Sequence, residues 1–153
     1  MKKLRLGARA PAGFTLLEVL VVLVIVGVTM TISAGRIHQL IIQNRIARAA
    51  TAVRNDLEAA FALAVRNRRP TRIAWSSSDM QLSVTDRPGT DTLRHTQLGR
   101  DAYGLSASAV TVSSSPVEVF PNGIANNTLT ITLSMEHITK QVIMSRAGMV
   151  QVK

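Results

Sequence analysis

The chain has 153 residues, close to half of them apolar, and carries 18 Lys and Arg against 9 Asp and Glu, which gives a formal net charge of +9. It contains no cysteine, so disulfides cannot hold a folded domain together in an oxidising compartment. This length leaves room for one membrane helix and one small domain, which must be held together by its apolar core.

The chain begins with a short basic peptide that ends in Gly13. Removing this peptide would lower the net charge from +9 to +5, because it holds four basic residues and no acid: Lys2, Lys3, Arg5 and Arg9. Positive charges in front of an apolar run keep the N-terminus in the cytoplasm and send the following chain outward. In a bacterium-like cell, the rest of the chain would therefore lie in the periplasm or beyond.

An apolar run follows from Phe14 to Ile32, interrupted by one carboxylate, Glu18. As a helix with a rise of about 1.5 Å per residue it would reach about 28 Å, enough to cross the core of a bilayer. A charge at mid-membrane costs on the order of 3 kcal/mol, so Glu18 is either a functional residue or lies near enough to the membrane edge to reach water.

A secretory signal peptide is the main alternative interpretation of this run. Such a signal has a basic start, a shorter apolar core and a small-residue cleavage site after it, and Ser33-Ala34 could serve as that site. The length of the run and the position of Glu18 inside it favour a retained membrane span instead.

The helix is expected to continue beyond the membrane as an amphipathic half, residues 35–69. Weak helix formers between Gly27 and Gly35 allow a local loss of helix there, with a continuous helix as the simpler reading. The expected end is Pro70. The predicted apolar stripe consists of Ile37, Leu40, Ile41, Ala47, Ala50, Val53, Leu57, Ala60, Phe61, Ala64 and Val65.

After Pro70 the apolar pattern changes to a period of two, which indicates strands. Residues 90–108 are polar and predict a loop with one short strand near Leu93. Strands are predicted at 72–75, 81–85, 110–112, 117–120, 128–134, 139–145 and 149–152. The predicted fold class is therefore α+β: one long N-terminal helix packed on a small antiparallel all-β domain at 70–153.

The sequence offers no convergent catalytic groups, so we expect no enzyme and no cofactor. His38, His95 and His137 lie far apart and in different elements, and their spacing does not suit a zinc site. The serine clusters at 76–78 and 113–115 lack the context of a nucleophile and are typical of turns.

The stretch Gly13-Phe14-Thr15-Leu16-Leu17-Glu18 resembles the processing motif of type IV prepilins and type II secretion pseudopilins. The resemblance also covers the basic leader and the apolar helix, and it implies a pilin-like fold. It implies that a prepilin peptidase cuts after Gly13 and that the same enzyme N-methylates the new N-terminus, Phe14. Residues 1–13 would then be a cleaved leader and residues 14–34 a transmembrane and filament-core helix.

Two later segments bear on the branch of the family. Val119-Phe120-Pro121-Asn122-Gly123 and Ser145-Arg146-Ala147-Gly148-Met149-Val150-Gln151-Val152 resemble the H-type minor pseudopilins and the related FimT-like minor pilins. After Asp101 the only acids are Glu118 and Glu136, too few for the calcium loop typical of the major pseudopilin.

The resemblance therefore implies a minor pseudopilin near the tip of a periplasmic pseudopilus that drives protein export by type II secretion. Its expected partners are the prepilin peptidase, other pseudopilins and inner-membrane lipids, with Glu18 setting the registry of subunits. The alternative is a FimT-like minor pilin in pilus biogenesis or DNA uptake. DNA is not expected as a partner, because the arginines that follow the closing Gly in that branch are absent after Gly148.

Overall fold

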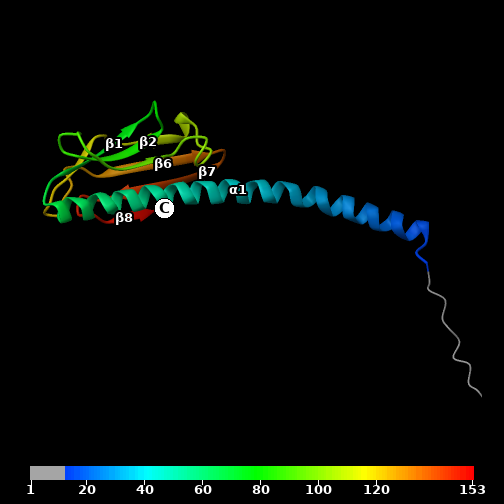
Figure 1. The fold of residues 1–153 in the computed structure, drawn as a ribbon. Coiled ribbons are helices and arrows are strands. Elements are labelled where there is room, and N and C mark those ends of the chain that lie inside the picture. Colours follow the sequence, from blue (N-terminus) through cyan, green and yellow to red (C-terminus); the bar gives the residue numbers. More distant parts are fainter. Residues whose placement is uncertain (1–12) are drawn as a thin grey trace, which may run out of the picture. The chain divides into compact units, whose positions relative to one another are not determined.

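The computed structural model describes residues 13–153, with the backbone alone described at 32–35. The predicted leader, 1–13, therefore lies outside the described residues except for Gly13. The chain divides into two compact units, Met1–Gln39 and Leu40–Lys153. One helix, α1 (Leu16–Asn67), runs through both, and eight strands follow it (Figure 1).

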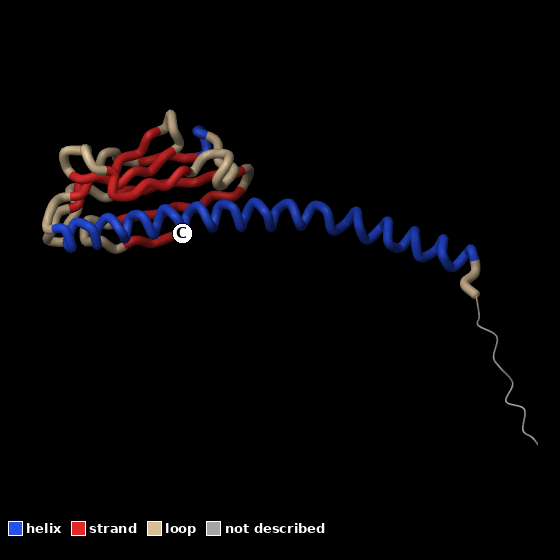
Figure 2. The backbone as a smooth tube through the Cα atoms, viewed as in Figure 1, coloured by secondary structure: helices blue, strands red, loops and turns tan. Residues whose placement is uncertain are grey.

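The strands form two antiparallel four-stranded sheets (Figure 2). The first has the order β3-β2-β1-β5 and the second the order β4-β6-β7-β8. The first consists of β1 (Thr71–Ser76), β2 (Gln81–Asp86), β3 (Thr92–Gln97) and β5 (Val117–Val119). The second consists of β4 (Val110–Val112), β6 (Leu129–Met135), β7 (Ile138–Met144) and β8 (Val150–Val152).

Alternation of buried and half-buried residues places one face of each sheet in the core. In β6 the buried residues are Leu129, Ile131 and Leu133, as their spacing of two predicts. They join buried residues of α1 and of both sheets in one apolar cluster. The predicted α+β fold is thus confirmed, and the strands after Pro70 lie within one or two residues of their expected positions.

The short strand expected near Leu93 is confirmed as β3, and the same polar segment also holds a short 3₁₀ turn at Ala107–Ala109. One expectation needs correction. The predicted apolar stripe is right from Ala50 to Ala64, with Phe61 half-buried, but wrong before Ala50 and at Val65. Ile37, Leu40, Ile41, Ala47 and Val65 are exposed, whereas Ile42, Ile46 and Ala49 are buried.

The error has a simple cause: the first part of the helix has apolar residues all round, so more than one stripe fits it. Only the second unit holds a β domain against which one face of α1 can be buried. In that unit, α1 ends at Asn67, three residues before Pro70, and β1 begins directly after it.

Candidate assembly site

The beginning of α1 is fixed by Thr15. Its hydroxyl oxygen accepts a hydrogen bond from the backbone N–H of Glu18 at 3.2 Å, and its carbonyl accepts the first helical bond, from Val19, at 3.2 Å. Thr15 is therefore the N-cap and Glu18 the third helical residue, the two ends of a Thr-x-x-Glu capping pattern. A carboxylate in the first turn also faces the positive end of the helix dipole.

Gly13 and Phe14 precede this cap in an irregular stretch of chain. Phe14 is 82% exposed, and a Cβ on Gly13 would meet no described atom within 4 Å beyond Gly13 and its chain neighbours. Both residues are thus exposed. The structure places Gly13, Phe14 and Glu18 within one short segment at the start of α1.

The apolar side chains that follow have no partner within the described part of the first unit. Every large apolar residue from Phe14 to Met30 is at least 40% exposed, for example Leu23 at 65% and Ile25 at 57%. The most apolar 18-residue window of α1 has a mean hydropathy of 2.5 and is 0% buried, which makes α1 long and apolar enough to cross a membrane.

Two hydroxyls within this run are satisfied locally. Thr29 donates to the carbonyls of Ile25 and Val26, and Thr31 donates to those of Gly27 and Val28 at 3.1 and 2.8 Å. Such bonds to the preceding turn lower the cost of placing a hydroxyl in lipid. The backbone of α1 is helical throughout the segment of weak helix formers.

The histidines are not brought together. His38 is exposed on α1 and His95 on β3, and His137 lies in the β6–β7 turn, 4.0 Å from the carboxylate of Glu136. Among the described residues, no group of three or more His, Asp or Glu side chains is placed to hold a metal ion.

Asp56 is a buried carboxylate that belongs to no sequence motif. It lies on the buried face of α1, is 1% exposed, and accepts a hydrogen bond from Nε of Arg94 in β3. Its second carboxylate oxygen is buried and has no partner among the described residues. Asp56 thereby ties the edge strand of the first sheet to the helix.

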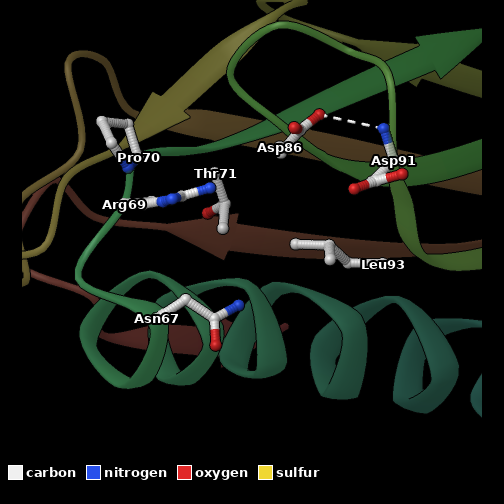
Figure 3. A pocket seen from close by; sticks show the side chains of 7 residues that line it. All are labelled: Asn67, Arg69, Pro70, Thr71, Asp86, Asp91 and Leu93. Carbon is white, nitrogen blue, oxygen red and sulfur yellow. Dashed lines mark hydrogen bonds between the residues drawn. The ribbon is translucent and has the colours of Figure 1, made fainter.

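A pocket of about 350 Å³ lies where α1 ends, and Figure 3 shows the side chains around it. Its polar side includes Asp86, whose carboxylate accepts hydrogen bonds from the backbone N–H of Asp91 and the hydroxyl of Thr90, each at 3.1 Å. The bond from Asp91 is the main reason that the pKa of Asp86 is lowered from its ordinary 3.8.

An exposed apolar helix with a threonine N-cap and a carboxylate in its first turn, followed by an amphipathic half and an antiparallel β domain, defines a pilin-like subunit. The comparisons with known proteins agree with this class. A model of the prokaryotic N-terminal methylation motif matches residues 9–34. The model of the Type II transport protein GspH matches residues 49–148, and the chain belongs to that family.

Solved structures with the same fold include both pilins and pseudopilins. The type IV minor pilin FimU of Pseudomonas aeruginosa PAO1 is 19% identical, with a TM-score of 0.57 over 72% of this chain and 90% of that one. The minor pseudopilin EpsH from the Type 2 Secretion System of Vibrio cholerae is 12% identical, with a TM-score of 0.52 over 71% and 96%. No curated protein sequence matches the chain.

These findings establish a role as a pseudopilin or pilin-like subunit. The family consists of structural subunits rather than enzymes. The methylation motif implies processing by a prepilin peptidase, and the family implies assembly with other pilin-like proteins. The apolar helix and the family together indicate a membrane anchor with a periplasmic domain.

Proposed function

We propose that the chain is a minor pseudopilin of a type II secretion system, cut after Gly13 and methylated on Phe14. The observation that carries the proposal is the unburied apolar surface from Phe14 to Met30. Burying one side chain of this kind is worth about 1.5–3 kcal/mol, so the segment requires lipid or other apolar helices around it. Lipid would hold the subunit before assembly, and neighbouring helices would surround it in the filament.

Glu18 is proposed to pair with the N-terminal amine of a neighbouring subunit. Cleavage after Gly13 would create that amine on Phe14, in the irregular stretch just before the helix that carries Glu18 in its first turn. A carboxylate and an amine that enter an apolar filament core together offset the cost of burying each charge. The pairing would set the registry of one subunit against the next.

The capping pattern gives Glu18 a second, purely local role. A glutamate at the third helical position stabilises the start of a helix, and glutamine is accepted there as well. Glutamine, however, cannot balance the charge of an amine. The variant Glu18→Gln therefore separates the two roles, because it preserves the capping pattern and removes the charge.

The proposed orientation has the N-terminus in the cytoplasm and residues 70–153 in the periplasm, as the basic leader favours. Residues 14–34 would form the transmembrane and filament-core helix and residues 35–69 the amphipathic half. Assignment to secretion rather than to a pilus is supported by the match to the Type II transport protein GspH. A minor type IV pilin is the second candidate, and the likeness to FimU supports it.

The test is to delete the gene in its native host and to restore it as wild type, Glu18→Gln or Glu18→Ala. Processing, incorporation into filaments, protein secretion and surface piliation are then measured. We expect normal processing in all three, with incorporation and secretion impaired alike in both variants. Normal secretion in Glu18→Gln with a defect in Glu18→Ala would leave only the capping role. Loss of pili with intact secretion on deletion of the gene would favour the pilin candidate.

A further inference from the structure

Three arginines lie close together in the sequence where α1 ends and β1 begins. Arg66 lies in the last turn of α1, and Arg68 and Arg69 lie in the junction that follows. All three are exposed. Within the part of the chain that the structure describes, none of their guanidinium groups forms an ion pair or a hydrogen bond. Elsewhere in the same unit arginines do reach carboxylates, as Arg54 reaches Glu58 at 2.7 Å.

Arg68 has an unfavourable backbone conformation. Its φ is 52° at the position that terminates α1, a left-handed position where glycine is usual because it has no Cβ. Positive charge near the last carbonyls of a helix is favourable. Arg66 and Arg69 already supply such charge, so the dipole does not require an arginine at the strained position. Strain of this kind is a reason to look for a contact that the side chain serves.

The pocket of about 350 Å³ adjoins this cluster and has a mixed lining. Arg69 brings a positive charge, two aspartates bring negative charges, and an amide and apolar groups complete the wall (Figure 3). This volume is large enough for one side chain of a partner. The wall comprises Asn67, Arg69, Pro70, Thr71, Asp86, Asp91 and Leu93.

We propose that Arg66, Arg68 and Arg69 form, with the adjoining pocket, a docking surface for a carboxylate-bearing segment of another protein. We call the three residues the arginine surface. A planar guanidinium binds a carboxylate through two parallel hydrogen bonds, so three exposed and unpaired guanidiniums suit such a segment. The residue of that segment that enters the pocket would be a hydrogen-bond donor or a cation, because Asp86 and Asp91 line one side.

A nucleic acid fits the same surface less well. Its backbone presents a negative charge at every step, and the carboxylates of Asp86 and Asp91 lie next to the arginine surface. A protein segment can place carboxylates against the arginines and donors against the aspartates. This proposal does not depend on the secretion role, since it concerns the second unit alone.

The test measures binding of the full-length chain in non-ionic detergent to a fluorescent peptide of glutamates with one central lysine, and to a fluorescent short DNA duplex. The triple variant Arg66→Gln, Arg68→Gln, Arg69→Gln should weaken peptide binding by roughly tenfold or more, as expected for the loss of several guanidinium–carboxylate contacts. A control variant of equal charge, Arg48→Gln, Arg100→Gln, Lys153→Gln, should weaken it by less than about threefold.

A single variant tests the strain argument. Arg68→Gly should raise the Tm by roughly 2–6 °C, because glycine tolerates the left-handed conformation, and should weaken peptide binding at the same time. Three results would overturn the proposal: equal weakening by the two triple variants, tighter binding of DNA than of the peptide with the same dependence on the arginine surface, or a Tm of Arg68→Gly that is unchanged or lower.

Discussion

Replacing Arg94 by alanine should destabilise the β domain far more than its position on an edge strand suggests. Arg94 reaches Asp56, whose side chain is 1% exposed, whereas its own side chain is 49% exposed. Without Arg94, the carboxylate of Asp56 would be buried with neither oxygen bonded to a side chain, since its second oxygen already lacks a partner among the described residues. The loss of stability in the variant therefore measures the cost of a buried charge that has no partner.

Breaking a buried ion pair from one side costs about 3–5 kcal/mol. Because half of the Arg94 side chain is in contact with water, we expect a smaller loss, about 2–3 kcal/mol. Arg87→Ala is the matched control, since Arg87 reaches Glu118 at 3.7 Å with side-chain exposures of 61% and 26%. An exposed pair of this kind contributes about 0–1 kcal/mol.

The assay is urea denaturation of the full-length chain in non-ionic detergent, followed by the fluorescence of Trp75, the single tryptophan, which packs against the core. Adding Asp56→Asn to Arg94→Ala should restore about 1 kcal/mol or more, because no buried charge then remains. A loss in Arg94→Ala no larger than in Arg87→Ala would refute this reasoning. No recovery in the double variant would do so as well.

Further predictions concern four single positions. Gly148→Ala should lower the free energy of unfolding by about 1–3 kcal/mol, since Gly148 has a φ of 83° and its new Cβ would lie 3.1 Å from the ring of Phe61. Gly123→Ala, at a φ of 78° in open space, should lower it by about 1 kcal/mol in the same denaturation assay. Thr15→Ala should lower the helix content in micelles measured by circular dichroism, whereas Thr15→Ser should not. Because the pKa of Asp86 is lowered, its carboxylate stabilises the folded state above about pH 4 and loses this effect as the pH falls through its folded-state pKa. In Asp86→Asn this loss of stability on acidification should be absent, as checked by an acid titration followed by NMR.

The β domain could be predicted closely because its strands alternate. Leu129, Ile131 and Leu133 follow a period of two, and a shift of one residue would expose all three. The apolar helix offered no such constraint at its beginning, and the stripe that was predicted around Ile37 and Leu40 is exposed. Hydrophobic spacing determines a buried face only where apolar and polar residues alternate around the helix.

Thr15, Asp56 and Arg68 were not predicted from the sequence, and they differ in whether a local sequence pattern could have identified them. Thr15 could have been found, because Thr-x-x-Glu before an apolar run is a known capping signature. Asp56 occupies a position on the buried face of α1, and only its distant partner Arg94 makes that position tolerable. A pair formed across 38 residues leaves no local pattern in one sequence. The left-handed conformation of Arg68 could not be predicted either, because glycine or asparagine usually occupies such a position.

The central claim is that the chain is a processed pilin-like subunit whose apolar helix is retained. Mass spectrometry of the mature protein, isolated from membranes that contain the prepilin peptidase, tests it most directly. We predict a chain that begins at N-methylated Phe14 and keeps the whole of the apolar run. A mature chain that begins at Gly35 would identify a discarded signal peptide and contradict the claim.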